Sequence, residues 1–315
     1  MKALLSICYA CVLLWMFNRC ASAPETINES CSPDEELCEG RCVAVGTCGE
    51  DHSESGVELV DSAKTASSIC SDAASANGSL SGAYQGAMIT AAGAKSYYLQ
   101  SNWWFLYDKQ SIAYNGLSFT VSNPTNAAVD AYTGSPIGYP SFFVGSYAGH
   151  ATSASNLPRK VSDIASIPTV FATNATQKGI ENHNAAFDVW FTPDASLLSN
   201  SQYSPPPGGA YLMIWLFDPE RRQPRGSNLH PGQTVEQAPG TWDVWIHATN
   251  PPCISYVSTT PLDTLEVDLN SFIRDSVDNG YGITGDMYLN LVFAGFEIWG
   301  GGDGLSVNRF CIQVN

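Results

Sequence analysis

Short runs in which apolar and polar residues alternate recur along this chain from about Cys70 to its end. Turn-forming residues separate the runs, and few segments with helical spacing lie between them. Alternation with a period of two is typical of strands that bury one face. The sequence therefore predicts an all-β sandwich or jelly roll. Its expected strands include Tyr97–Asn102, Ser118–Val121, Ala186–Phe191, Tyr211–Phe217, Thr241–His247 and Leu289–Phe296.

One segment departs from this alternation. In residues 268–277, apolar side chains stand at positions 269, 272, 273 and 277, which is the spacing of one helix face. Asp268 and Asn270 are suitable capping residues, and Gly280 follows as a residue that can end a helix. We expect a single helix here, packed on the outer face of the sandwich.

Composition narrows the class of protein. The chain holds 27 Gly and 18 Pro, and only 14% of its residues are charged, which is typical of a secreted all-β domain. Its formal net charge of -16 would repel the phosphates of nucleic acid, whereas uncharged polysaccharide meets no such barrier. The five histidines lack paired or i, i+4 spacing, so we expect no metal and no cofactor.

The first residues indicate export. Met1 and Lys2 precede the apolar run from Ala3 to Phe17, which fits a secretory signal peptide over residues 1–23 and is short for a membrane anchor. Cys20 leaves lipid anchoring open as the less favoured alternative. We expect a secreted, extracellular protein without membrane contact beyond the signal.

The segment that follows divides into a cysteine-rich stub and a linker. Residues 31–49 hold four cysteines in a stretch too short for a hydrophobic core, so we expect two disulfides, in any of three pairings, rather than a metal site. Residues 50–67 are polar and rich in acidic and serine residues, as linkers are. The main domain should span 68–315. Seven cysteines remain once the leader is removed, so one is free or pairs outside the chain.

Residues 294–299 read A-G-F-E-I-W and place one carboxylate among aromatic residues on a predicted strand. Positions 293, 295, 297 and 299 share one face, so Glu297 should lie beside Phe293 and Trp299 and be partly desolvated. Desolvation raises the pKa of a carboxyl group, as a general acid for glycosidic cleavage requires. On composition alone, a solvent-facing edge glutamate is the simpler interpretation.

Several motifs in sequence order resemble those of glycoside hydrolase family 12, the endo-acting β-1,4-glucanases and xyloglucanases. Residues 294–308 are similar to its acid/base motif A-G-F-E-P-W and the following G-L-x-V-N, with Ile298 in place of proline. Residues 97–104 resemble its Y-x-x-Q-N-N-x-W strand, 139–158 its Y-P-S…L-P region and 184–190 its N-A-A-Y-D-I-W motif. The resemblance covers nearly all of 70–315 and implies a concanavalin-like β-jelly roll.

The resemblance also implies roles for individual residues. Glu297 takes the place of the acid/base, and Asp188 that of the carboxylate supporting the nucleophile. Asn102 and Trp104 take the place of residues that line the sugar cleft.

Aromatic faces stack on the apolar faces of pyranose rings, so further tryptophans are candidates for the cleft. We expect Trp215 and Trp245 there, together with Met213. A plain core position is the alternative for each tryptophan.

The nucleophile strand departs from the family. Residues 211–215 read Y-L-M-I-W where the family has E-L-M-I-W or E-I-M-I-W, so Tyr211 stands in the place of the nucleophile. A retaining glycosidase needs two carboxyl groups roughly 5–5.5 Å apart, and losing one of them strongly impairs hydrolysis. Two rescues stay open: attack by Tyr211, ionised with the help of Asp188, or inversion in which Asp188 activates water and Glu297 is the acid.

The cysteines of the main domain depart too. Cys70 matches the family's N-terminal cysteine, but the usual partner position is Ser111. We expect Cys253 and Cys311 to form a replacement disulfide, which leaves Cys70 as the odd thiol.

The resemblance implies a monomer directed to β-1,4-glucan, whether cellulose, mixed-linkage glucan or xyloglucan. Two functions remain open at this point. The first is a polysaccharide-degrading enzyme of the cellulase type whose hydrolysis is impaired or rerouted by Tyr211. The second is a non-catalytic glucan-binding or decoy protein.

Overall fold

The computed structural model describes the backbone of residues 35–38 and 41–44, Cys70, and residues 76–315 except for 105–109, 124–134, 180, 197–202 and 220–221. The chain divides into two compact units, Met1–Val57 and Glu58–Asn315. In the first unit, β1 (Glu35–Cys38) and β2 (Arg41–Ala44) form an antiparallel hairpin. The predicted signal peptide, the linker and the cysteine pairing of the stub lie outside the described residues and stay predictions.

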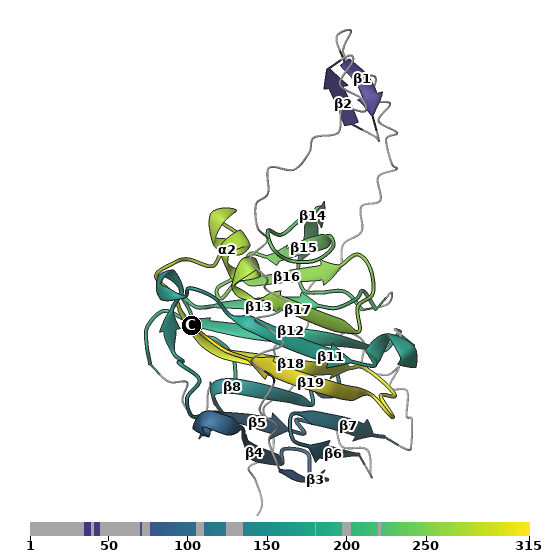
Figure 1. Ribbon diagram of the computed structural model, residues 1–315, viewed down its shortest axis with the longest axis vertical. Coiled ribbons are helices and arrows are strands. Elements are labelled where there is room, and N and C mark those ends of the chain that lie inside the picture. Colours follow the sequence, from purple (N-terminus) through teal and green to yellow (C-terminus); the bar gives the residue numbers. More distant parts are fainter. Residues whose placement is uncertain are drawn as a thin grey trace, which may run out of the picture. The chain divides into compact units, whose positions relative to one another are not determined.

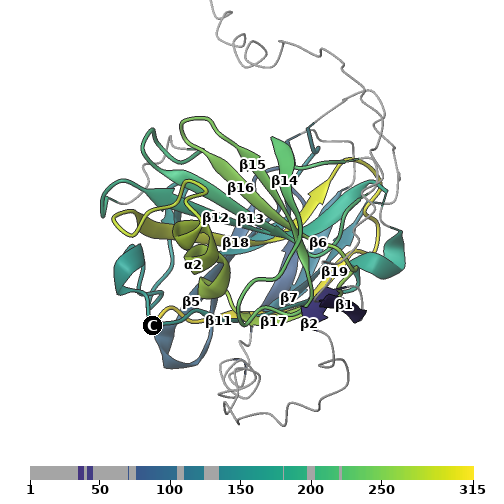
Figure 2. The same ribbon diagram turned by 90° about the horizontal axis from the view of Figure 1, so that it is seen from above.

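The second unit is a sandwich of two β-sheets that stack face to face (Figures 1 and 2). The larger sheet has the order β14-β15-β16-β13-β12-β18-β8-β5-β4, with β10 paired to β18 and β9 to β8. Its pairs are antiparallel except β13 with β16. Its strands are β4 (Gly86–Thr90), β5 (Ser96–Gln100), β8 (Ser141–Tyr147), β9 (His150–Ala151), β10 (Arg159–Lys160), β12 (His183–Thr192), β13 (Ala210–Trp215), β14 (Ser227–Gln233), β15 (Trp242–His247), β16 (Cys253–Ser258) and β18 (Tyr288–Ile298).

The smaller sheet has the order β17-β11-β19-β7-β6-β3. Its strands are β3 (Asn77–Leu80), β6 (Ser111–Asn115), β7 (Ser118–Ser122), β11 (Pro168–Thr173), β17 (Thr264–Asp268) and β19 (Ser306–Ile312). Three short 3-10 helices, η1 (Ala92–Ala94), η2 (Val161–Asp163) and η3 (Ala175–Lys178), connect strands of the sandwich. The all-β jelly roll predicted from the sequence is confirmed, and each of the six expected strands is present.

Period-two alternation decides which side chains enter the core between the sheets. On β18, Val292, Ala294 and Phe296 belong to the main core, while Phe293 belongs to a second cluster on the opposite face. The core joins the two sheets through aromatic contacts such as that of Phe171 on β11 with Phe187 on β12, whose ring centroids are 5.1 Å apart. Burying a side chain of this size contributes about 1.5–3 kcal/mol. The larger sheet therefore carries an apolar cluster on each of its faces.

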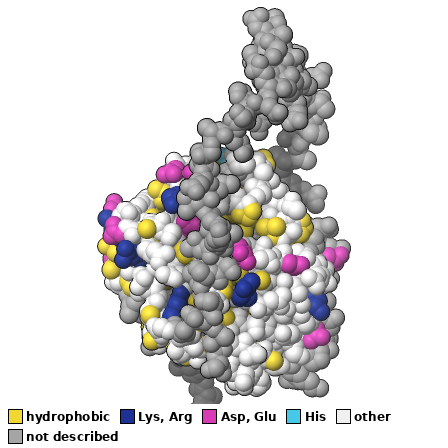
Figure 3. All heavy atoms as spheres, in the orientation of Figure 1, with side chains coloured by type: hydrophobic (Ala, Val, Ile, Leu, Met, Phe, Trp, Pro, Cys, Tyr) yellow, Lys and Arg dark blue, Asp and Glu magenta, His cyan; other side chains and the backbone are white. Residues whose placement is uncertain are grey.

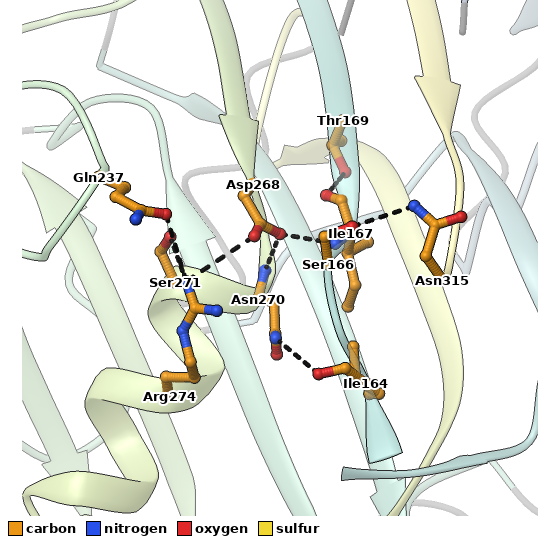
Figure 4. Close-up of polar contacts among 10 residues, drawn as sticks. All are labelled: Ile164, Ser166, Ile167, Thr169, Gln237, Asp268, Asn270, Ser271, Arg274 and Asn315. Carbon is orange, nitrogen blue, oxygen red and sulfur yellow. Dashed lines mark hydrogen bonds and ion pairs between the residues drawn. The ribbon is translucent and has the colours of Figure 1, made fainter. Parts of the chain in front are cut away.

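The predicted helix is present as α2 (Asn270–Asp278), the one α-helix among the described residues. It ends as expected: Gly280 has a φ of 68°, its N–H donates to the carbonyl of Val277, and the N–H of Tyr281 donates to that of Ser276. Only a residue that tolerates positive φ closes a helix in this way. At the other end, Asp268 Oδ1 accepts the N–H of Asn270 at 3.0 Å (Figure 4).

The position expected for α2 is wrong. Phe272 contacts the rings of Trp242 and Tyr256, at centroid distances of 4.9 and 5.2 Å, and all three belong to the main core. The helix therefore packs on the core side of the larger sheet rather than on an outer face. Asp268 ties its first turn to the smaller sheet, because the same Oδ1 accepts the N–H of Ile167 at 2.6 Å (Figure 4).

The predicted disulfide between Cys253 and Cys311 is wrong, and so is the expectation that Cys70 is the odd thiol. Cys311 pairs with Cys70, with 5.5 Å between their Cα atoms, and Cys253 is a free, buried thiol. The neighbours of Cys311 on β19, Phe310 and Ile312, face the core, so Cys311 faces the opposite side of the smaller sheet. Cys253 lies on the far face of the larger sheet. The core separates the two thiols.

Peptide mapping tests this pairing. Non-reducing digestion should give a linked pair of peptides that contain Cys70 and Cys311. Because burial raises the pKa of the Cys253 thiol to about 12, that residue should react with iodoacetamide at pH 8 only after denaturation. Cys253→Ser is the matched control and should leave the linked pair intact. A linked pair containing Cys253 would contradict the assignment.

Candidate active site

A cleft of about 270 Å³ lies on the face of the larger sheet that points away from the smaller sheet. The central strands β12, β13 and β18 supply its floor, because every second residue of each strand faces this side. Its lining holds the two carboxylates singled out in the sequence, a set of aromatic side chains and one arginine: Asn102, Trp104, Tyr139, Tyr147, Asp188, Trp190, Tyr203, Tyr211, Met213, Arg225, Cys253, Phe293 and Glu297.

Glu297 is held by its cross-strand neighbour Asn184. Asn184 Nδ2 donates to Glu297 Oε2 at 2.8 Å, and the backbone N–H of Glu297 donates to Asn184 Oδ1 at 3.1 Å. The carboxyl group is open to the cleft on one side and enclosed by protein on the others. Desolvation raises its pKa to about 7, against the opposing effect of the Asn184 hydrogen bond. Glu297 can therefore hold a proton near neutral pH, as a general acid must.

Asp188 is the second carboxyl group of the floor. Burial raises its pKa to about 7, and the negative charge of Glu297 adds to the rise. The nearby indole of Trp190 acts in the opposite direction, but its Nε1 makes no hydrogen bond of ordinary geometry with Asp188. Asp188 Oδ1 is buried and lacks a hydrogen-bond partner among the described residues. A buried carboxyl oxygen without a partner favours the protonated state.

Tyr211 lies on the same floor, next to Asp188 along the sheet. Its ring packs edge-on against Trp190, with centroids 5.7 Å apart, and the nearby Ser204 side chain favours the ionised phenol only weakly against the effect of burial. Burial and the charge of Asp188 raise the pKa of Tyr211 to about 12. The charge of Asp188 therefore opposes ionisation of the phenol, which disfavours the rescue in which Tyr211 attacks.

Strand register places Asp188 between Tyr211 and Glu297. Trp190 pairs with Tyr211, whereas Glu297 pairs with Asn184 at the other end of the motif. The charge of Asp188 acts on the pKa of Tyr211, and that of Glu297 acts on the pKa of Asp188. The negative charge of Glu297 thus raises the pKa of Asp188, the carboxyl group that lies between Glu297 and Tyr211.

Close backbone contacts fix the position of Glu297. At Gly295, a Cβ atom would lie 2.1 Å from the carbonyl oxygen of Pro140, so no other residue fits between β18 and the start of β8. At Ile298, the residue that replaces the family's proline, the N–H donates to the carbonyl of Gly138 at 3.1 Å. A proline could not make this bond.

The cleft contains some, but not all, of the residues expected to bind sugar. Trp104 is 40% exposed at the cleft, and its Nε1 donates to Asn102 Oδ1 at 3.0 Å. Met213 also lines the cleft. Trp215 is buried against Trp299, with ring centroids 6.1 Å apart, in a cluster that Trp245 joins from its edge. Neither Trp215 nor Trp245 is part of the lining.

The cleft also contains residues that the sequence had not assigned to it. Tyr147 follows the alternation of β8, so that pattern could have placed it. Tyr203 is 60% exposed and lies on a loop, where no periodicity signals its position. Cys253 lines the cleft beside Tyr211, its register partner on β13.

The residues that the structure describes hold no group of three or more His, Cys, Asp or Glu side chains arranged to bind a metal ion. None of the helices in the described part of the chain has the length and apolar character needed to cross a membrane.

Residues 95–315 match the family model described as glycosyl hydrolase family 12. The chain is 29% identical over 237 residues to endoglucanase S of Pectobacterium parmentieri, covering 70% of this chain and 83% of that protein. It is 30% identical over 164 residues to the probable cellulase Cel12b of Mycobacterium tuberculosis, covering 51% and 98%. Among solved structures, endoglucanase Cel12A of Rhodothermus marinus is similar with a TM-score of 0.63 and 32% identity, covering 76% of this chain and 99% of that one.

The raised pKa values predict how stability changes with pH. An unfolded carboxyl group has a pKa of about 4, whereas those of Asp188 and Glu297 are about 7. Between these values the folded protein binds more protons than the unfolded chain, so the free energy of unfolding falls as pH rises from about 4 to 7. The double variant Asp188→Asn/Glu297→Gln should lose this dependence and melt above wild type at pH 8. Parallel melting curves for the two proteins would contradict the assignment.

A second prediction concerns Asn184. Asn184→Ala removes the hydrogen bond that stabilises the ionised form of Glu297, so the pKa of Glu297 should rise further above about 7. Carbon-13 NMR of labelled glutamate side chains measures this, with Glu297→Gln identifying the signal. Asn228→Ala, which removes a bond to Asp243 elsewhere, is the control and should leave the signal unmoved. An unchanged pKa in Asn184→Ala would refute the role given to Asn184.

Proposed function

This chain belongs to glycosyl hydrolase family 12, and we propose that it is a secreted protein that binds β-1,4-glucan in an endoglucanase-type cleft whose retaining hydrolysis is disabled by Tyr211. The observation that carries the proposal is the chemistry of position 211. A phenol with a pKa of about 12 stands on the cleft floor where the family's motif has glutamate. Retaining hydrolysis needs a nucleophilic carboxylate there, and a neutral phenol does not replace it.

The rest of the cleft supports sugar binding. Trp104 and Tyr203 are exposed aromatic side chains at its lining, and such faces cover the apolar faces of pyranose rings. Asn102 supplies an amide, held in place by Trp104 and by the carbonyl of Tyr139. Concave sites lined by aromatic groups with a few placed polar ones are the usual form of ligand sites.

The ligand class follows from the family together with the uncharged character of most of the lining. We expect cellulose, mixed-linkage glucan or xyloglucan to bind, and the protein to act as a monomer outside the cell. A protein of this kind would hold glucan chains, or would act as a decoy that competes for an inhibitor of active relatives.

A second function is favoured by one specific observation: burial raises the pKa values of both Asp188 and Glu297, and the charge of Glu297 adds to the rise at Asp188. Both groups have a pKa of about 7, so at that pH one can be ionised while the other is protonated. An ionised Asp188 would activate water, and a protonated Glu297 would protonate the leaving oxygen. This pair would give hydrolysis with inversion, which needs carboxyl groups about 6.5–9.5 Å apart.

Reducing-sugar release from cellulose, mixed-linkage glucan and xyloglucan separates the two functions. Wild type should release less than about one thousandth of the sugar that Tyr211→Glu releases, because restoring a catalytic carboxylate restores the pair that acts as a unit. Tyr211→Phe is the matched control, since it keeps the ring against Trp190 and removes the hydroxyl. It should bind glucan as wild type does and stay inactive.

The opposite result would be wild-type activity that disappears in both Glu297→Gln and Asp188→Asn. That outcome would overturn the proposal in favour of the inverting mechanism, and NMR of the first product anomer would show inversion. Activity lost in Tyr211→Phe would instead identify the phenol as the nucleophile.

A further inference from the structure

Among the described residues that line the cleft, Arg225 is the one cation, beside two carboxylates and neutral side chains. It lies at the end of the cleft that holds Tyr211 and Cys253: the adjacent Gly226 packs against the backbone of His247, which pairs with Cys253, and Cys253 pairs with Tyr211. The described ion pairs join other residues: Lys160 with Asp286, Arg274 with Asp268, and Arg309 with Glu266. The guanidinium of Arg225 is therefore exposed to the cleft without a carboxylate partner among the described residues.

Positively charged residues are concentrated in the segment that contains Arg225. The chain has 14 Lys and Arg against 30 Asp and Glu, yet three of the 14 stand within residues 221–225. On the face shown in Figure 3, by contrast, acidic and basic side chains are scattered among uncharged ones. The loop between β13 and β14 also holds Asp218, which accepts a hydrogen bond from Gln223 at 2.9 Å.

A second arginine of this loop lies along the same face of the larger sheet. The guanidinium of Arg222 lies 5.9 Å from the ring centroid of Trp299, two residues beyond Glu297. Trp299 in turn contacts Trp215. The loop thus presents positive charge beside both the Tyr211 and the Glu297 strands.

Tyrosine at position 211 also affects the charge balance around Arg225. A glutamate there would place a negative charge within reach of Arg225, and the neutral Tyr211 leaves the guanidinium without that partner. Asp188 and Glu297, the acidic groups among the described residues of the cleft, are largely protonated below about pH 7. An unpaired guanidinium recognises carboxylates through charge-assisted, often bidentate, hydrogen bonds.

We propose that Arg225 makes the cleft selective for β-1,4-linked polysaccharide that carries carboxylate groups, with the carboxylate bound at the end of the cleft formed by Tyr211 and Cys253. The proposal rests on the glucan-binding function above and names the chemical class of the ligand. The overall charge of the protein does not explain this selectivity, because a protein of net charge -16 repels an anionic polymer.

Affinity gel electrophoresis at 4 °C with carboxymethylcellulose and hydroxyethylcellulose tests it, since the two polymers share a backbone and differ in the charge of their substituents. Wild type should bind the carboxymethyl polymer about fivefold or more tightly at low salt, the range of one partly exposed charge pair. Arg225→Met should lose this preference and bind the two polymers about equally. Arg225→Lys should keep most of it, and 0.5 M NaCl should abolish it in wild type.

Arg309→Met is the matched control, because it removes the same charge from the smaller sheet and should leave the preference intact. Equal or tighter binding of hydroxyethylcellulose by wild type would overturn the role of Arg225 and leave the glucan-binding function standing. So would a preference that persists in Arg225→Met. Failure of wild type to bind either polymer would overturn both proposals. Retained binding of hydroxyethylcellulose shows that Arg225→Met is folded.

Discussion

The antiparallel pairing of β12 with β18, at the centre of the larger sheet, is the constraint on which the rest of the cleft depends. Phe187 and Val189 on β12, with Val292 and Ala294 on β18, bury their side chains in the main core, so neither strand can slip by one residue without exposing them. This register sends the intervening residues to the opposite face. Packing in the core thereby determines which side chains form the floor of the cleft on the opposite face of the sheet.

Burying two carboxyl groups on the floor of the cleft disfavours their ionised forms. Hydrogen bonding compensates for this at Glu297 more than at Asp188. Glu297 receives a hydrogen bond from Asn184, which lies directly across the ladder. Asp188 has an oxygen without a partner among the described residues and feels the charge of Glu297 as well. Both groups hold their protons to about pH 7 for this reason, and the same burial that makes them useful acids makes the folded state less stable when they ionise.

Local patterns predicted most of this architecture from the sequence. The helical spacing of Phe272 and Ile273 and the position of Gly280 were sufficient for α2, and alternation around Phe293 was sufficient to place Glu297 on an aromatic face. The helix was placed on the wrong side, since spacing does not say which sheet a helix covers. The predicted Cys253–Cys311 disulfide was wrong because it was inferred from positions in the chain. Those positions do not show that the core separates the two thiols. Tyr203 and Arg225 lie on loops, where no period predicts which way a side chain points.

Tyr211 is part of the floor of the cleft through both its backbone and its ring. Its backbone pairs with both β12 and β16, and its ring extends the aromatic cluster around Trp190. A glutamate in this place would add a third buried carboxyl group next to Asp188, where like charges disfavour ionisation. The phenol stays neutral up to about pH 12 and removes that repulsion. A neutral side chain at position 211 therefore lowers the electrostatic cost of folding this part of the cleft, whose described lining at that end also includes Arg225.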